Sequence, residues 1–329
     1  MNCAAALRIL LSDAAYAAIG PRLSQILADR PYVRVAANTP GADADIAFVS
    51  RDITGLSTKH ETLPATAIFY DALRRAPSLR WVHGHAAGAD RQIFQDLMAR
   101  GVQVTSSSGA NASVVVQTAL AGLLALARRF PRMMVAQRSH TWAPLIKTGL
   151  PRDLAGQTAV IVGWGPIGQQ LGALLDAIGL RVVAVRRHAG PANAAVETVA
   201  YEDLTAVLPR ADWLVLACPL TERTRALVNA QALACLPDGA HLVNVARGEI
   251  VDEAALVSAL QSGKLAGACL DVFEHEPLQA DSPLWDMLNV IVTPHSAGFS
   301  DGNAAKVEQM FLDNLASWLA GRTLHNLAN

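Results

Sequence analysis

The sequence predicts an α/β protein made of two doubly wound domains, each with a parallel sheet. Short apolar runs rich in β-branched residues alternate with helical patterns along most of the chain, as such sheets require. Residues 158–187 contain a strand, a glycine-rich turn, a helix and a second strand in one unit. The length of 329 residues, of which 52% are hydrophobic and 17% charged, suits about two globular domains.

The first third of the chain predicts the smaller domain. Helical patterns lie at Asp13–Ala28, Ala67–Arg75 and Asp90–Arg100. Between them, strands are expected at Leu7–Leu11, Val33–Ala36, Asp45–Val49, Leu79–His83 and Val102–Thr105. We interpret Leu7–Leu11 as a first strand, because no basic segment or long apolar run of a signal peptide precedes it.

The middle of the chain combines a buried helix with an irregular segment. Ala112–Arg129 is apolar nearly all round, so a helix there must be buried on most faces and can lie between the two domains. Pro131–Pro151 contains prolines, a glycine and Trp142, and we expect an irregular arm. We also expect this arm to cross to a second subunit in a homodimer.

The remaining sequence predicts a larger domain with six strands. Helices are expected at Tyr201–Leu208 and at Asp252–Ser262, where Asp252 can cap the start. A last helix, Gly302–Ala320, must return to the first domain or to the boundary. The strands are expected at Thr158–Val162, Arg181–Val185, Trp213–Ala217, His241–Val245, Ala268–Val272 and Val290–Val292.

The motif Gly163-Trp164-Gly165-Pro166-Ile167-Gly168 follows the first of these strands and opens a helix. The first glycine permits a tight turn, the second lets the backbone approach a pyrophosphate, and the third lets helix and strand pack closely. Pro166 suits a helix start because it lacks an N–H that would have no partner there. This context indicates a dinucleotide-binding loop; the alternative is an ordinary glycine-rich turn.

Three polar clusters follow strands of the larger domain, where open α/β sheets bind ligands. Arg247 follows a strand directly and can clamp a carboxylate, unless it is a surface arginine. The segment 271–277 holds carboxylates and His275 and is either part of a site or a solvated acidic loop. His295 follows the last strand and can carry a proton to or from a carbonyl, unless it is structural.

The segment 81–90 of the smaller domain places small residues after a strand, where backbone N–H groups can bind a carboxylate. His83 and His85 lie two residues apart on one strand face. No third ligand accompanies them, so we expect no metal site.

Charge and cysteine content exclude several classes of protein. The net charge is −1 and no basic run occurs, which argues against nucleic acid or an anionic membrane as partner. The four cysteines are scattered, which favours a reducing, cytoplasmic location. The longest apolar stretch is too short to span a bilayer comfortably.

Six segments together resemble the D-isomer-specific 2-hydroxyacid dehydrogenases, and they occur in the order of that family. They are LAGQTAVIVGWGPIG, CPLTERTRALVN, VNVARGEIVDEAAL, LDVFEHEPL, SPLWDMLNVIVTPHSAG and FLDNLASWLAGRTLHN. The resemblance implies Rossmann-like and flavodoxin-like domains with an active-site cleft between them. The substrate domain would comprise residues 1–108 and 297–329, and the dinucleotide-binding domain residues 109–296. Members commonly dimerise through the latter.

The resemblance also implies site residues. Arg247, Glu276 and His295 match the catalytic Arg–Glu–His set, and Ala87 and Gly88 match the loop that holds the substrate carboxylate. The cofactor would contact the glycine-rich motif and a further set of residues, namely Cys218, Thr224, Val245, Asp271 and Gly298. The sequence departs from the family at Val116-Gln117-Thr118, where Ala-Glu-His is common.

The expected function is NADPH-dependent reduction of a small 2-keto acid to the D-2-hydroxy acid. NADP(H) is expected in preference to NAD(H) because Arg186 and Arg187 stand where NAD-dependent members have an aspartate. Hydride would reach the keto carbon, Arg247 would bind the carboxylate and carbonyl, His295 would protonate the new hydroxyl, and Glu276 would keep His295 charged.

A non-catalytic, dinucleotide-sensing protein of the corepressor type is the main alternative. Formate oxidation is disfavoured because that member of the family has glutamine at the position of Glu276. A phosphoglycerate dehydrogenase with appended regulatory domains is also disfavoured, because the sequence ends soon after the last helix.

Overall fold

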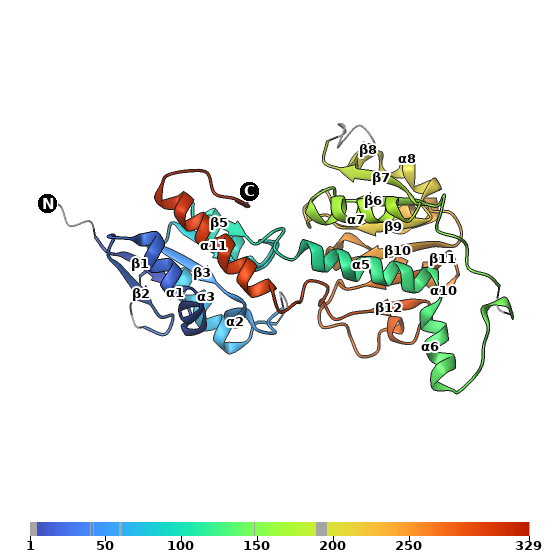
Figure 1. Cartoon of the computed structure of the whole chain (residues 1–329), viewed down its shortest axis with the longest axis horizontal. Coiled ribbons are helices and arrows are strands. Elements are labelled where there is room, and N and C mark those ends of the chain that lie inside the picture. Colours follow the sequence, from blue (N-terminus) through green and yellow to red (C-terminus); the bar gives the residue numbers. More distant parts are fainter. Residues whose placement is uncertain are drawn as a thin grey trace. The chain divides into compact units, whose positions relative to one another are not determined.

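The chain builds one unit, leaves it to build a second, and then returns to the first. The computed structural model describes residues 5–39, 41, 43–58, 61–147, 149–188 and 196–328. Unit 1 comprises residues 1–111 and 300–329, and unit 2 comprises residues 112–299. The sequence analysis placed the two domain boundaries between residues 108 and 109 and between residues 296 and 297. Figure 1 shows the two units in different colour ranges, with the red C-terminal helix in the unit that contains the N-terminus.

Unit 1 is a five-stranded sheet with the order β2-β1-β3-β4-β5, the arrangement of flavodoxin-like folds. Every pair of neighbouring strands is parallel. The strands are β1 (Leu7–Leu10), β2 (Tyr32–Val35), β3 (Ile46–Val49), β4 (Trp81–Gly84) and β5 (Gln103–Ser106). The helices are α1 (Asp13–Leu27), α2 (Arg51–Thr54), α3 (Pro64–Arg75), α4 (Gln92–Ala99) and α11 (Asn303–Leu319).

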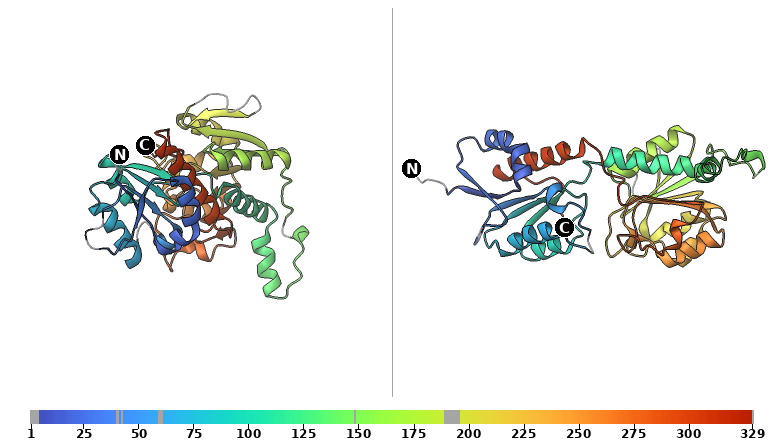
Figure 2. Two further views of the ribbon diagram at one scale, coloured as in Figure 1. Left: turned by 60° about the vertical axis from the view of Figure 1, so that its left-hand side comes forward. Right: turned by 90° about the horizontal axis from the view of Figure 1, so that it is seen from below.

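The two faces of this sheet bury separate apolar clusters. Helices α1 and α11 cover one face, and α3 and α4 cover the other, as the right-hand view of Figure 2 shows. On the first face the ring of Phe311, from α11, stacks on Phe48 at 4.7 Å and on Trp81 at 5.4 Å between centroids. The C-terminal helix is therefore part of the core of unit 1.

Unit 2 is a seven-stranded parallel sheet with the order β12-β11-β10-β9-β6-β7-β8, which contains the doubly wound order of dinucleotide-binding folds. Its strands are β6 (Thr158–Val162), β7 (Arg181–Arg186), β8 (Glu197–Ala200), β9 (Trp213–Leu216), β10 (Ala240–Asn244), β11 (Leu265–Leu270) and β12 (Val290–Val292). Its helices are α5 (Ala112–Ala127), α6 (Phe130–Arg138), α7 (Pro166–Ala177), α8 (Leu204–Val207), α9 (Ala230–Cys235) and α10 (Glu253–Gln261).

The central strands of unit 2 are buried on both faces, as their continuous apolar runs predict. Helices α5 and α7 cover one face, and α8, α9 and α10 cover the other. The α5 helix comes so close to β11 that a Cβ on Gly122 would lie 2.3 Å from the sulfur of Cys269. This close packing explains why α5 has a glycine at position 122.

Two expectations about unit 2 are wrong. The sequence predicted six strands, but β8 adds a seventh at the edge of the sheet. The sequence ETVA of β8 is only partly buried and has no apolar run, so the usual signal of a buried strand is missing. The arm 131–151 was expected to be irregular, yet it begins with α6, because Pro131 lies in the first turn of a helix, where proline is tolerated.

A left-handed residue, Arg129, separates α5 from α6. Arg129 adopts a left-handed conformation, with φ of 57°, and this ends one helix before the other begins. Among the described residues no single helix is both long and apolar enough to cross a bilayer. Helices α5 and α6 meet that test only together, and the chain bends by 71° between them.

Candidate cofactor and active site

Two glycines of the glycine-rich loop lie in close contact with neighbouring backbone atoms. Gly163 has a φ of 104°, and a Cβ there would lie 2.5 Å from the backbone of Ala217 and Cys218. A Cβ on Gly168 would lie 2.0 Å from the carbonyl oxygen of Gly163. Any side chain at either position would displace backbone atoms. Both positions therefore require glycine, because β6, α7 and the segment after β9 approach one another closely here.

Gly165 differs from its two neighbours in the motif, because a Cβ there would meet nothing within 4 Å. Gly165 is the N-cap of α7 and Pro166 is its first residue, and no described side chain caps this helix start. The N–H groups of the first turn therefore remain available to an anion. Open space beside Gly165 and an uncapped helix fit a dinucleotide pyrophosphate.

The end of β7 carries the two arginines expected beside the cofactor ribose. Arg186 is the last residue of the strand and half-buried, while Arg187 is exposed. Burial raises the pKa of Tyr201 to about 12, and the positive charge of Arg187 opposes this shift. No carboxylate residue follows β7 within residues 186–188. Two positively charged side chains at this strand end can bind an anionic group.

Cys218 and Thr224 belong to the segment after β9. Burial raises the pKa of the Cys218 thiol to about 12, so this group is a neutral, apolar contact at physiological pH. Thr224 is fully buried, and its hydroxyl donates to the carbonyl of Pro219 and accepts from the N–H of Thr221. Thr224 thus fixes the shape of this loop at the carboxyl edge of the sheet.

His295 and Glu276 form a close polar pair at this edge of unit 2. His295 Nδ1 lies 2.8 Å from Glu276 Oε2, and the carboxylate is buried while the side chain of His295 is 48% exposed. The backbone N–H of Phe273 donates to the other oxygen, Oε1, at 3.2 Å. Because the carboxylate accepts from Nδ1, the imidazole presents Nε2 as its second nitrogen. The pair can orient an imidazole for proton transfer.

Asp271 holds the loop that carries His295. One oxygen accepts from the Thr293 hydroxyl at 2.6 Å and from the Ser296 N–H at 2.8 Å, and the other accepts from the Ala297 N–H at 3.0 Å. The Asp271 carbonyl also accepts from the N–H of His295 at 2.8 Å. His295 has a φ of 49°, and this network holds it in that rarely occupied conformation. Gly298 follows directly after the anchored segment.

Arg247 lies after β10 in a loop that touches the Glu276 loop. Val245 is buried, and Arg247 Nη1 donates to the carbonyl of Ala246 at 2.7 Å. A Cβ on Gly248 would lie 1.8 Å from the carbonyl carbon of Phe273. Backbone contact at Gly248 thus joins the two loops. The sequence analysis did not include Gly248 or Thr293 among the site residues. The only signal in the sequence was for Gly248, a glycine directly after Arg247.

Ala87 and Gly88 lie in unit 1, in the loop after β4. Ala87 is exposed and Gly88 half-buried, so the backbone is accessible there. His83 and His85 have separate partners. His83 is fully buried and bonds to the hydroxyls of Thr105 and Ser107, whereas His85 Nε2 lies 2.7 Å from the Thr54 hydroxyl. Burial is the main reason that the pKa of each histidine falls to about 3.

The fold and this site define a class of protein, an α/β protein with a glycine-rich loop of the dinucleotide-binding type and a hydrogen-bonded His–Glu pair at the same sheet edge. The sequence profile of the D-isomer specific 2-hydroxyacid dehydrogenase NAD binding domain matches residues 120–297, most of unit 2. The chain belongs to the D-isomer specific 2-hydroxyacid dehydrogenase family.

Relatives within this family differ in length and in name. The glyoxylate reductase of Korarchaeum cryptofilum is 34% identical over 275 residues, which cover 82% of this chain and 80% of the relative. The D-3-phosphoglycerate dehydrogenase of Mycobacterium bovis is 38% identical over 70% of this chain, but the match spans only 43% of that relative. An NADPH-dependent glyoxylate/hydroxypyruvate reductase of Sinorhizobium meliloti, solved with NADP and sulfate, is 27% identical with a TM-score of 0.76, and 98% of each chain is covered.

Proposed function

We propose that the protein is an NAD(P)-dependent oxidoreductase that reduces a small 2-keto acid, of the glyoxylate or hydroxypyruvate type, to the D-2-hydroxy acid. The observation that carries the proposal is the His295–Glu276 pair, 2.8 Å apart, after β12 and β11. The glycine-rich loop follows β6 at the same edge of the same parallel sheet. The family and the relatives named glyoxylate reductase support this substrate class.

Each residue of the proposed site has a distinct task. Glu276 accepts from Nδ1 of His295 and so directs Nε2 outward, where it donates a proton to the substrate carbonyl oxygen. Arg247 binds the substrate carboxylate and polarises the carbonyl, and the backbone N–H groups of Ala87 and Gly88 also hold the carboxylate. A bound nicotinamide supplies the hydride for this chemistry.

The proposal is tested by assaying glyoxylate, hydroxypyruvate, pyruvate and longer 2-keto acids with NADPH and with NADH. We expect turnover of at least one short keto acid and a D-configured product. Tight dinucleotide binding without turnover of any acid in this series would favour the corepressor-type alternative instead.

We further propose that NADP(H) is preferred over NAD(H), on the basis of Arg186 and Arg187. Each charge-assisted hydrogen bond to a 2′-phosphate contributes roughly 1.5–3 kcal/mol. After discounting for the solvent exposure of Arg187, a preference of about tenfold to a thousandfold in kcat/KM follows. Support also comes from the NADP in the Sinorhizobium meliloti structure.

The matched pair of variants is Arg186→Asp and Arg181→Asp, at opposite ends of β7. The first should shift the preference toward NADH, mainly through KM for the cofactor, while the second should leave the preference unchanged because Arg181 lies at the other end of the strand. Equal kcat/KM for both cofactors in the unmodified protein would contradict this assignment.

The arm 131–151 supports a proposal of a homodimer. Its apolar side chains are unusually exposed, Trp142 by 94% and Ile146 by 76%. A soluble protein rarely leaves such groups in water, so a second copy of the chain is the proposed cover. Light scattering should give a particle mass twice that of the chain. The double variant Trp142→Ser, Ile146→Ser should give a particle mass closer to that of one chain. Ile68→Ser, at an exposed site in α3, serves as the control; a monomeric unmodified protein at micromolar concentration would refute the proposal.

A further inference from the structure

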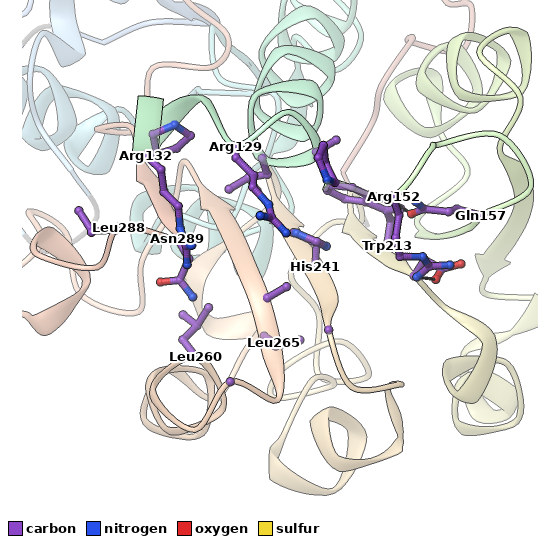
Figure 3. A pocket seen from close by; sticks show the side chains of 18 of the residues that line it. Arg129, Arg132, Arg152, Gln157, Trp213, His241, Leu260, Leu265, Leu288 and Asn289 are labelled. Carbon is purple, nitrogen blue, oxygen red and sulfur yellow. Dashed lines mark hydrogen bonds and ion pairs between the residues drawn. The ribbon is translucent and has the colours of Figure 1, made fainter. Parts of the chain in front are cut away.

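Histidines with little solvent contact occur in both units, but their surroundings differ. In unit 2 the ring of His241 stacks on Trp213, with centroids 4.3 Å apart, and borders the cavity drawn in Figure 3. In unit 1 His83 is fully buried, and both of its ring nitrogens lie within hydrogen-bond distance of a hydroxyl group. The hydrogen bonds of His83 can therefore be followed atom by atom.

Two buried hydroxyls flank the imidazole of His83. Its Nδ1 lies 2.8 Å from the hydroxyl of Thr105, and its Nε2 lies 3.0 Å from the hydroxyl of Ser107. Burial is the first cause that lowers the pKa of His83 to about 3, so the ring is neutral at physiological pH and carries one proton. The nitrogen that holds this proton decides the direction of both hydrogen bonds.

The hydroxyl of Ser107 decides which nitrogen that is. It donates to the carbonyl of Gly84 at 3.0 Å, and a carbonyl can only accept. A hydroxyl has one proton to donate, so toward the Nε2 of His83 it can only accept. Nε2 therefore carries the proton, and Nδ1 accepts from the hydroxyl of Thr105. That hydroxyl in turn accepts from the indole N–H of Trp81 at 2.9 Å.

The result is a chain of hydrogen bonds with a single direction, from the indole of Trp81 to the carbonyl of Gly84. Every side-chain polar atom in this network has a partner. Buried networks that are fully satisfied are rigid and specify one arrangement. The chain ends on Gly84, the last residue of β4, where the strand leads into the loop 85–88.

Ser107 holds this loop at a second point through its backbone. The N–H of Ser107 donates to the carbonyl of Ala86 at 2.9 Å. The carbonyls of Gly84 and Ala86, on either side of His85, are thus both bonded to Ser107. The next two residues of the loop, 87 and 88, follow directly from this anchored backbone.

We propose that Ser107, held by His83, is a positioning residue for the substrate carboxylate. It fixes the backbone that leads to Ala87 and Gly88, whose N–H groups hold the carboxylate in the proposed function, on which this inference rests. A carboxylate that is held equally in the substrate complex and in the transition state contributes to KM and not to kcat. Loss of the Ser107 hydroxyl should therefore act on KM.

The variant Ser107→Ala removes this hydroxyl and leaves the carbonyl of Gly84 and the Nε2 of His83 without it. We expect KM for the keto acid to rise about tenfold, the scale of one lost hydrogen bond, while kcat changes by less than about threefold. KM for the dinucleotide should not change, because the loop holds only the carboxylate. An unchanged KM for the keto acid would overturn the proposal.

Ser57→Ala is the matched control in the same unit. Ser57 is also buried, and its hydroxyl lies 2.7 Å from that of Thr66 and accepts from the N–H of Leu63 at 3.0 Å. Both variants leave buried polar groups without a partner, so both should lower the Tm. The control should leave KM unchanged, and an equal rise of KM in both variants would reduce Ser107 to a structural role.

A pair of variants at Thr105 tests the part played by His83. Thr105→Val keeps the shape of the side chain but removes the hydroxyl that donates to Nδ1, so that His83 can carry its proton on either nitrogen. We expect KM for the keto acid to rise about threefold. Thr105→Ser keeps the hydroxyl and should give a KM near that of the unmodified protein. Equal KM values in the two variants would remove His83 from the proposal.

Binding of oxamate, an isostere of pyruvate, separates this inference from the proposed function. Isothermal titration calorimetry on protein saturated with NADPH should show that the Kd of oxamate rises about tenfold in Ser107→Ala and not in Ser57→Ala. Oxamate binding with this pattern, but without turnover of any keto acid, would contradict the proposed function alone. An equal Kd in Ser107→Ala and the unmodified protein, or no binding of oxamate to the unmodified protein, would overturn the role of Ser107.

Discussion

Replacing Gly248 by alanine should separate Arg247 from the His295–Glu276 pair. The added Cβ would lie 1.8 Å from the carbonyl carbon of Phe273, 2.0 Å from its oxygen and 2.3 Å from the N–H nitrogen of Glu274. Ordinary contact needs about 3.4 Å or more, so the two loops must move apart by roughly 1.5 Å. Both partners are backbone, so no side-chain rotation can relieve the clash.

A displacement of about 1 Å in a catalytic group can cost about a hundredfold in rate. We therefore expect Gly248→Ala to lower kcat for keto acid reduction about a hundredfold. Overpacking should also cost about 1–3 kcal/mol of stability, which lowers the Tm by about 2–4 °C for each kcal/mol.

Steady-state kinetics and a thermal melt measure both effects. Gly302→Ala is the matched control, because a Cβ there meets nothing within 4 Å. It should leave kcat unchanged. If Gly248→Ala retains activity within a few-fold of the unmodified protein, the contact between the two loops does not position Arg247.

Three further predictions concern protonation and burial. His295→Ala should lower kcat by about a hundredfold or more, the usual scale for general acid–base catalysis, and near-normal kcat would remove His295 from the mechanism. Burial raises the pKa of Cys218 and of Cys269 to about 12, so alkylation at pH 8 should label neither in the native protein, whereas half-buried Cys235 should react; mass spectrometry of the labelled peptides measures this. Burial lowers the pKa of His83 from 6.5 to about 3, so between these values the unfolded chain binds a proton that the folded chain does not. The free energy of unfolding should therefore fall as the pH falls below 6.5, by up to about 1.4 kcal/mol per pH unit. Urea unfolding at pH 7 and at pH 5 measures this fall, which should be smaller in His83→Asn than in the unmodified protein.

The parallel α/β architecture could be predicted because its local signals are strong. The run of Thr158–Val162 is apolar and β-branched, and β6 has these same bounds. Edge elements were harder, because β8 is paired on one side only and carries a partly polar sequence. Helix α6 was missed because a proline ends most helices but is accepted in a first turn.

The candidate site, too, could be predicted only in part. The sequence located Glu276 and His295 after two strands, and parallel strands bring such residues to one edge of a sheet. It did not reveal that Asp271 fixes the His295 loop through both oxygens, because that depends on the folded path of residues 293–297.

The position of α11 has a consequence for synthesis of the protein. Phe311 completes the core of unit 1 between Phe48 and Trp81, but the ribosome makes it only after all of unit 2. Unit 2 is continuous in sequence and can fold as soon as residue 299 has emerged. The segment 5–111 must wait, with one face of its sheet covered by α1 alone, until α11 arrives. The nascent chain is therefore expected to depend on chaperones mainly through its earliest residues, although these were translated first.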